Sequence, residues 1–247
     1  MPPSCVDTLY ARADAPRGDF IFDERVARVF ADMLARSVPG LAELVRLIGL
    51  LGARLVQPGT RVYDLGCSLG ASSASILARL PPSLDDGDAA IRLYAVDRAP
   101  AMLDELRLRL DEPIQRGRLQ PICADLADVA IADASLVVLN LTLQFLAPEQ
   151  RLPLLQRIRA GLRPGGALIL AEKVALGDDD ALLTQVHADF KAAQGYSQLE
   201  IARKRAALEQ VLIPDSMQTH QDRLQEAGFT RIEPFFQCLN FVGWVAR

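Results

Sequence analysis

The stretch Asp64-Leu65-Gly66-Cys67-Ser68-Leu69-Gly70 follows the short apolar run at residues 61–65 and opens into a helical pattern at residues 71–80. Glycines at such a turn let a ligand approach the backbone, and the first turn of a helix offers free N–H groups. The spacing D-x-G-x-S-x-G differs from the dinucleotide fingerprint G-x-G-x-x-G. Asp64, two places before the first glycine, suits a ligand that carries an ammonium group. The stretch therefore predicts a ligand-binding loop that is not built for nicotinamide dinucleotides.

Working outward from this loop, strand and helix patterns alternate. Buried-strand composition recurs at residues 91–97, 119–123, 135–140 and 166–171, and helical patterns cover residues 101–110 and 148–162. This alternation predicts right-handed crossovers and a parallel sheet covered on both faces. The alternation of strands and helices stops at the end of the chain, where residues 229–236 and 239–245 form two strand patterns joined by Gln237-Cys238. A connection this short is antiparallel.

The 247 residues are expected to form a single α/β domain with four parts. Helical patterns at residues 23–36 and 41–55 predict an N-terminal helical cap over residues 1–56, and the core βαβ units follow at residues 57–176. Residues 177–227 form a helical insertion with breaks near Gly195 and Pro214, and residues 228–247 form the C-terminal hairpin.

Composition narrows the function classes. Lys and Arg number 27 against 31 Asp and Glu, so the net charge of -4 argues against a broad nucleic-acid-binding face. No apolar run reaches the ~20 residues of a membrane-spanning helix, and the start, Met1-Pro2-Pro3-Ser4-Cys5-Val6-Asp7, lacks the pattern of a secretory signal. We therefore expect a cytoplasmic protein without membrane contact. No protein-bound metal is expected, because the cysteines and histidines lack ligand spacing: Cys5, Cys67, Cys123, Cys238, His187 and His220.

Two further carboxylates follow strands. Asp97 ends the second strand, a position from which a carboxylate can accept hydrogen bonds from both ribose hydroxyls. Asp125 follows the strand at residues 119–123, where it could hold an adenine amino group. A lone glycine-rich turn is often only structural, and an acid at a strand end is often a helix cap. Their order along the chain nevertheless favours a nucleoside-cofactor site.

Together these features resemble the class I S-adenosylmethionine-dependent methyltransferases, as does Leu162-Arg163-Pro164-Gly165-Gly166-Ala167 at the start of the strand pattern at residues 166–171. The resemblance implies a Rossmann-like, seven-stranded sheet with an antiparallel C-terminal hairpin. Longer strings are similar to one family, the carboxy-S-adenosyl-L-methionine synthases. Besides the loop itself, these strings are Phe22-Asp23-Glu24-Arg25-Val26-Ala27, Arg36-Ser37-Val38-Pro39-Gly40, Val56-Gln57-Pro58-Gly59-Thr60, Val137-Val138-Leu139-Asn140-Leu141-Thr142-Leu143-Gln144-Phe145-Leu146, Asp189-Phe190-Lys191, Gly195-Tyr196-Ser197 and Lys204-Arg205.

The family resemblance implies an activity. It implies that S-adenosyl-L-methionine and prephenate are converted to carboxy-S-adenosyl-L-methionine and phenylpyruvate, without a metal. The product would supply the carboxymethyl group that a separate enzyme attaches to a wobble uridine of tRNA. The resemblance also implies a homodimer, in which an arginine of one subunit, Arg205 here, holds the new carboxylate in the other subunit's site.

Carried over position by position, the family's cofactor contacts fall on Gly66, Cys67, Ser68, Asp97, Arg98, Asp125, Leu126 and Asn140. Two positions depart from the family. Arg98 stands where the family often has asparagine, and Leu41 replaces a tyrosine, which removes a hydroxyl contact. Arg205 has the planar fork that suits a carboxylate, but Arg203-Lys204-Arg205 lies in a polar helical pattern, and such a pattern is usually a solvated surface.

Other residues and other functions stay open at this point. His187 and Tyr196 could line the substrate side, although helix packing explains them more simply. Glu172 and Lys173 follow the strand pattern at residues 166–171, where either a substrate contact or a surface ion pair is expected. Trp244 fits the core of the hairpin. The loop would equally serve a conventional small-molecule methyltransferase, or a non-catalytic cofactor-binding scaffold that partners the tRNA-modifying enzyme.

Overall fold

The computed structural model describes residues 6–11, 18, 20–84, 87–177 and 181–247. Cys5 and the first residues of the chain therefore lie outside the described part. A seven-stranded sheet runs in the order β3-β2-β1-β4-β5-β7-β6, and β7 is antiparallel to both of its neighbours. Its strands are β1 (Arg61–Leu65), β2 (Arg92–Asp97), β3 (Leu119–Cys123), β4 (Ala134–Asn140), β5 (Leu162–Lys173), β6 (Ile232–Cys238) and β7 (Phe241–Ala246). The predicted fold class is confirmed.

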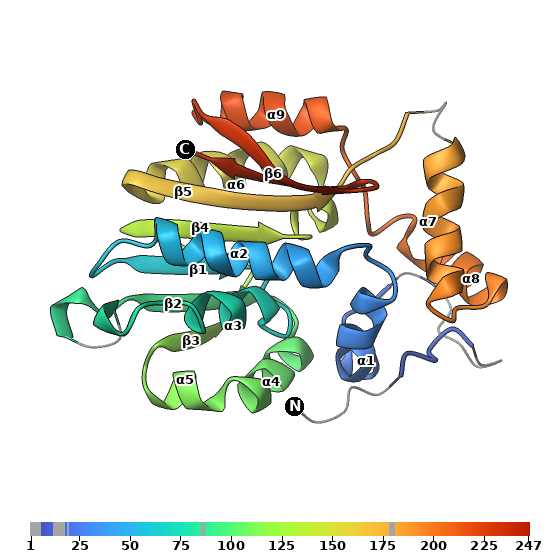
Figure 1. Cartoon of the computed structure of the whole chain (residues 1–247), viewed down its shortest axis with the longest axis horizontal. Helices are drawn as coiled ribbons and strands as arrows, with labels where there is room; N and C mark the ends of the chain where they lie inside the picture. Colours follow the sequence, from blue (N-terminus) through green and yellow to red (C-terminus); the bar gives the residue numbers. More distant parts are fainter. Residues whose placement is uncertain (1–5, 12–17, 19, 85–86, 178–180) are drawn as a thin grey trace.

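Alternating residues of the strands build two cores, one on each face of the sheet (Figure 1). On one face, Val62 and Leu136 pack with helices α2 (Leu41–Leu55), α3 (Ala71–Leu77) and α4 (Pro100–Arg109). On the other face, Val137 and the fully buried Trp244 pack with α6 (Pro148–Gly161) and α9 (Met217–Glu226). Successive residues of a strand point to opposite faces, so both cores come from the same strands.

Three helices gather at the end of the sheet where β1, β2 and β4 finish: α1 (Glu24–Ala35), α7 (Ala181–Ala193) and α8 (Gln198–Leu208) (Figure 1). We call α7 and α8 together the helical arm. The predicted breaks near Gly195 and Pro214 are confirmed, because they separate α7, α8 and α9. The side chain of Ser197 caps α8 in a reciprocal capping box with Glu200, which fixes where α8 begins. The short α5 (Asp111–Gln115) follows α4.

The predicted connection of the hairpin was wrong by two residues. Gln237 and Cys238 belong to β6 and pair with Val242 and Phe241, and the turn is made by Leu239 and Asn240. Leu239 adopts a φ of 50°, a conformation that is uncommon for leucine and that its apolar side chain does not signal. The predicted turn Arg163-Pro164-Gly165 lies within β5, where the register against β4 shifts between Ala134 and Leu136.

No helix in the described part of the chain is long and apolar enough to cross a membrane.

Candidate functional site

The loop after β1 has the backbone conformation that its glycines predict. Gly66 has a φ of 74° and Gly70, which precedes α3, has a φ of 79°. The N–H groups of Gly66 and Cys67 both donate to the carbonyl of Val96 at 2.8 and 2.9 Å, which ties the loop to β2. A Cβ atom on Gly66 would lie 2.5 Å from the side chain of Thr142. The loop is therefore closed on both sides, and position 66 has no room for a side chain.

Asp97 fixes the same loop from β2. One carboxylate oxygen accepts the N–H of Ser68 at 2.8 Å and the other accepts the N–H of Ala99 at 2.9 Å. Burial raises the pKa of Asp97, against these hydrogen bonds, which favour the charged form. The side chain is half-buried, so part of it faces the open edge of the sheet. Asp97 thus joins the two loops between which a ribose would lie.

Asp64 lies deeper than the other site carboxylates. It is 1% exposed, and one oxygen accepts both the N–H of Ser73 at 3.0 Å and its hydroxyl at 2.6 Å. Burial raises the pKa of Asp64 to about 6, against the hydrogen bonds from Ser73, so the carboxylate is mostly ionised at neutral pH. Asp64 thus places a buried negative charge at the base of the loop.

Asn140 ends β4 beside the loop. Its Nδ2 donates to the hydroxyl of Ser72 at 3.1 Å, whereas its buried Oδ1 has no partner among the described residues. A buried acceptor without a donor is costly unless a ligand supplies one. Asn140 Oδ1 is therefore an acceptor that the donor of a ligand could satisfy beside the loop.

The surface ion pair considered for Glu172 and Lys173 is not what the structure shows. Glu172 is fully buried at the end of β5, and its carboxylate accepts three successive backbone N–H groups, at 3.0 Å from Thr142, 2.8 Å from Leu143 and 3.2 Å from Gln144. No salt bridge joins Glu172 to a described residue. The hydroxyl of Thr142 in turn donates to the carbonyl of Leu65 at 3.0 Å. Glu172 thus fixes the wall against which Gly66 packs.

Asp125, Leu126 and Arg98 lie farther out. Asp125 is exposed and accepts the N–H of Ala127 at 2.9 Å, and the carbonyl of Leu126 accepts a hydrogen bond from Arg157 at 2.6 Å. The side chain of Arg98 is exposed. Backbone pairing brings the two loops together, because the N–H of Ala124 donates to the carbonyl of Asp97 at 3.2 Å. The predicted adenine and ribose positions are therefore neighbours at one edge.

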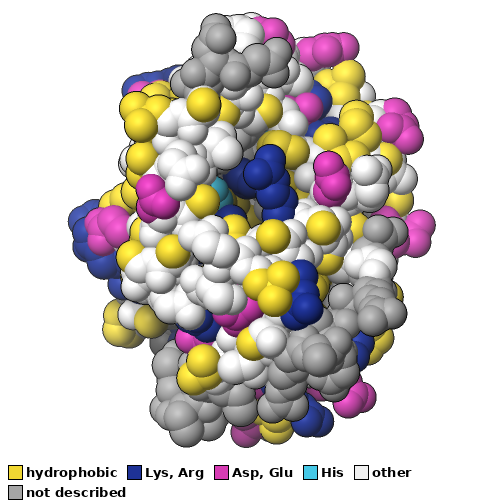
Figure 2. All heavy atoms as spheres, turned by 90° about the vertical axis from the view of Figure 1, so that its right-hand side faces the viewer, with side chains coloured by type: hydrophobic (Ala, Val, Ile, Leu, Met, Phe, Trp, Pro, Cys, Tyr) yellow, Lys and Arg dark blue, Asp and Glu magenta, His cyan; other side chains and the backbone are white. Residues whose placement is uncertain are grey.

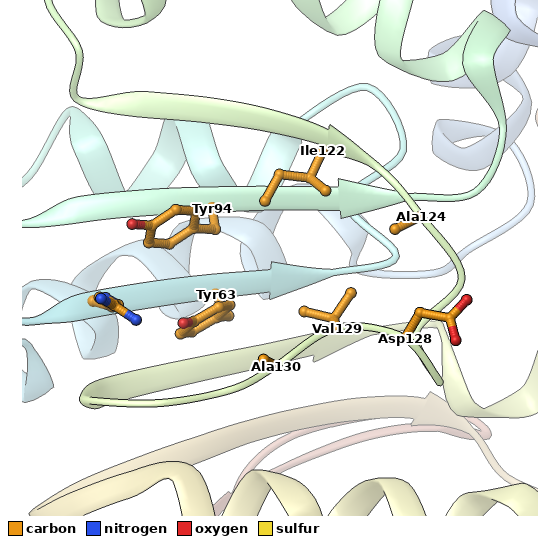
Figure 3. A pocket seen from close by; sticks show the side chains of 8 residues that line it. Tyr63, Tyr94, Ile122, Ala124, Asp128, Val129 and Ala130 are labelled. Atoms are coloured by element: carbon orange, nitrogen blue, oxygen red, sulfur yellow. The ribbon is translucent and has the colours of Figure 1, made fainter.

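A separate pocket of about 320 Å³ lies against β1, β2 and β3 (Figure 3). Tyr63 and Tyr94 stack in its wall with ring centroids 5.1 Å apart, and Arg61 lies over the ring of Tyr94 at 6.0 Å. The predicted loop residues Gly66, Cys67 and Ser68 do not line this pocket. It is therefore distinct from the loop site.

The helical arm brings positive side chains to the same end of the sheet. Figure 2 shows Lys and Arg side chains in a hollow near the middle of this end, with a histidine beside them. Ala207 of α8 belongs to the same apolar cluster as Leu69 of the loop and Met102 of α4, so the arm packs beside the loop. Arg205 is exposed on α8 and makes no hydrogen bond or ion pair with any described residue. It does lie close enough to Lys173 and Lys191 to lower the pKa of both.

His187 and Tyr196 are buried packing residues. The ring of His187 packs edge-on against Phe241 at 5.5 Å, and its Nε2 lies 2.9 Å from the carbonyl of Ser37. Burial, then the charges of Lys191 and Lys173, lower the pKa of His187 to about 4, so the ring is neutral and Nε2 donates to this carbonyl. The hydroxyl of Tyr196 donates to the buried Asp7.

The sequence reasoning missed the buried state of Lys204. Its Nζ donates to the hydroxyl of Ser37 at 2.9 Å and lies 3.7 Å from Asp7. The polar helical pattern around it indicated a solvated surface, but Asp7 and Ser37 come from distant segments.

Leu41 is half-buried at the start of α2.

Glu172 should give the protein a measurable pH dependence. Burial raises its pKa from 4.5 to about 7, against the three amide hydrogen bonds. The folded protein then binds this proton more tightly than the unfolded chain, so the free energy of unfolding falls as the pH rises from 4.5 to about 7. In the wild type this fall in the free energy of unfolding should be on the order of 3 kcal/mol. We expect it to be absent in Glu172→Gln. Urea unfolding at several pH values measures it, and parallel curves for variant and wild type would contradict the assignment.

The fold and the loop define a class of protein. A model of the methyltransferase domain matches residues 62–166. An O-methyltransferase family protein from Burkholderia thailandensis superposes with a TM-score of 0.63 at 18% identity, over 92% of this chain and 60% of the other. Human N-acetylserotonin methyltransferase, solved with S-adenosylmethionine, gives a TM-score of 0.60 at 17% identity, over 91% of this chain and 55% of the other. The chain thus spans little more than half of these proteins, and it has the class I methyltransferase fold.

Curated relatives identify the family within this class. The carboxy-S-adenosyl-L-methionine synthase of Vibrio cholerae serotype O1 is 48% identical over 95% of this chain and 94% of the relative. That of Erwinia tasmaniensis is 49% identical over 97% of this chain and 96% of the relative. The chain belongs to the carboxy-S-adenosyl-L-methionine synthase family, whose members are transferases.

Proposed function

We propose that this enzyme converts S-adenosyl-L-methionine and prephenate to carboxy-S-adenosyl-L-methionine, phenylpyruvate and water. The observation that carries the proposal is the meeting of two features at one edge of the sheet. One is a loop whose Asp64, Asp97 and Asn140 fit an adenosyl amino-acid ligand. The other is a hollow with Lys and Arg side chains beside it, which suits a co-substrate with two carboxylates (Figure 2).

When bound, the sulfonium supplies an acidified methyl group, and prephenate supplies CO2 and a hydroxide equivalent as its ring becomes aromatic. The chain's own residues then have three tasks: to hold the adenosyl ligand, to hold the dicarboxylate and to exclude water. Asp97 holds the loop in place, and Arg205 offers a fork for the new carboxylate. His187 donates to the carbonyl of Ser37, and burial lowers its pKa to about 4, so it is too weakly basic to serve as a strong base.

The experiment that tests this function has two parts. Purified protein with both substrates is expected to form phenylpyruvate, and mass spectrometry is expected to find a cofactor heavier by one CO2. A methylated product with unmodified cofactor would instead indicate a conventional methyltransferase. Cofactor binding without any turnover of prephenate would indicate a scaffold.

Arg205 is proposed to bind the carboxylate that the reaction adds. We expect Arg205→Ala to leave S-adenosyl-L-methionine affinity nearly intact and to weaken carboxy-S-adenosyl-L-methionine by about 2 kcal/mol or more, because the charge-assisted pair is lost. Calorimetric titration with each ligand measures the difference. Equal losses for both ligands would remove Arg205 from this role.

We further propose that the protein is a homodimer in which the arm of one subunit completes the site of the other. Large apolar side chains are exposed on the arm: Leu182 at 74%, Leu199 at 56% and Val186 at 38%. Leu182 and Val186 are four residues apart on α7 and therefore neighbours on one face, and a contiguous exposed apolar patch is typical of an interaction surface. In the single chain, Arg205 acts on Lys173 and Lys191 of the same chain, so a shared site requires its own test.

Subunit complementation provides that test. We expect a mixture of refolded Arg205→Ala and Gly66→Ala chains to regain about a quarter of the wild-type activity, because half of the dimers are mixed and each has one intact site. Each variant alone should be inactive at the same concentration. A mixture that stays inactive would show that Arg205 serves its own chain.

The remaining proposals concern the surroundings of the enzyme. We propose that it works in the cytoplasm without a metal and without direct contact to nucleic acid or membrane. Its product would supply a tRNA carboxymethyltransferase that modifies a wobble uridine. The net charge of -4 supports the absence of a nucleic-acid-binding face.

A further inference from the structure

The use of lysine in this chain is uneven. Of its 27 positive residues only three are lysines, namely Lys173, Lys191 and Lys204, and the others are arginines. All three lie at the arm end of the molecule, at the end of β5, on α7 and on α8. None of them is fully exposed. A chain that uses arginine almost everywhere thus has its lysines in one place.

Among the described residues, two of these lysines have no counter-ion. Lys204 is paired with Asp7, whereas the ammonium groups of Lys173 and Lys191 make no hydrogen bond or ion pair with any described residue. The charged and titratable groups that act on Lys191 are Lys173 and Arg205, and Lys191 in turn acts on His187 and Lys204. Every one of these is basic. Like charges held together without an anion cost free energy, which a bound anion would return.

We propose that Lys173 and Lys191 form the site for the carboxylates of the co-substrate. This inference rests on the proposed function and assigns residues to it. Two cations on two elements, β5 and α7, can each contact one carboxylate of a dicarboxylate, and Figure 2 shows Lys and Arg side chains in a hollow at this end of the molecule. The adenosyl ligand's own carboxylate is a different anion, and the experiment separates the two.

The choice of lysine has a physical reason. Burial, then the charges of Lys173 and Arg205, lower the pKa of Lys191 to about 8, and burial and Arg205 lower the pKa of Lys173. A lysine with a lowered pKa can lose its charge at moderately alkaline pH, which arginine cannot do. Dicarboxylate binding should weaken as the pH rises through about 8, because the neutral amine no longer attracts the anion.

The test uses prephenate as the probe and protein saturated with S-adenosylhomocysteine, which lacks the methyl group and cannot react. We expect Lys191→Met and Lys173→Met each to weaken prephenate binding by about tenfold or more, and to leave S-adenosyl-L-methionine affinity within about twofold. Arg107→Met, an exposed change of the same charge on α4, is the matched control and should alter neither affinity.

Lys191→Arg separates a ligand contact from mere packing. Near neutral pH, Lys191→Arg should bind prephenate about as tightly as the wild type. Between about pH 7.5 and 9 it should lose less affinity than the wild type, because arginine stays charged. Unchanged prephenate binding in both methionine variants would overturn the assignment, and so would a loss confined to S-adenosyl-L-methionine. If wild-type protein forms carboxy-S-adenosyl-L-methionine while these variants bind normally, only this inference fails. If wild-type protein does not bind prephenate, the proposed function fails with it.

Discussion

Gly66→Ala is expected to abolish useful cofactor binding. The new methyl group would lie 2.5 Å from Cγ2 and Oγ1 of Thr142, and alanine would have to adopt a φ of 74°. Thr142 cannot move away easily, because Glu172 holds its N–H at 3.0 Å and its hydroxyl donates to Leu65. The loop must move instead, and its contacts with Asp97 move with it. We expect S-adenosyl-L-methionine affinity to fall by about 100-fold or more, measured by calorimetry.

A second glycine provides the control. Gly117 has a similar φ of 69°, but a Cβ atom there would meet nothing within 4 Å. Gly117→Ala should therefore cost about 1 kcal/mol of unfolding free energy from backbone strain alone and leave the cofactor affinity unchanged. If Gly66→Ala binds the cofactor as well as Gly117→Ala does, the contact with Thr142 does not determine the shape of the loop.

The part of the site that follows from the sequence is local. Gly66, Asp64 and Asp97 are recognisable because turn glycines and acids at strand ends are signals within a few residues. The supports of the loop are not local: Glu172 lies 30 residues from Thr142, and nothing near Glu172 indicates three amide partners. The same holds for Lys204, whose neighbours Asp7 and Ser37 are distant in sequence.

The fold could be predicted further than the details of its turns. Alternating strand and helix patterns fix a parallel sheet, and a very short connection fixes an antiparallel pair. The turn at Leu239 and Asn240 could not be placed, because its backbone conformation depends on pairing with β7 rather than on a glycine. The lysine cluster is recognised only when the sequence and the structure are considered together. The scarcity of lysine is visible in the sequence, whereas only the structure shows that Lys173 and Lys191 have no counter-ion among the described residues.

Arg151→Met is expected to give the largest loss of stability. Arg151 is fully buried in α6, and Asp215 forms an ion pair with it and with Arg223, the latter at 2.6 Å. The Arg151 guanidinium also donates to the carbonyl of Leu146 at 2.8 and 3.0 Å and to that of Ile213 at 2.9 Å. Methionine fills similar space without a donor, so buried acceptors lose their partners. We expect the free energy of unfolding to fall by about 3 kcal/mol.

Arg163→Met is the matched control, because Arg163 is exposed and its nearest carboxylate oxygen, on Asp133, lies 3.3 Å away. This change should cost less than about 1 kcal/mol. Chemical unfolding of both variants gives the comparison, and equal losses would show that Arg223 alone suffices for Asp215. Loss of Arg151 should also affect the position of α8, because Ile213 and Asp215 anchor the segment that follows this helix. Arg151→Met should therefore also weaken carboxy-S-adenosyl-L-methionine more than S-adenosyl-L-methionine, since Arg205 lies on the helix that this segment secures.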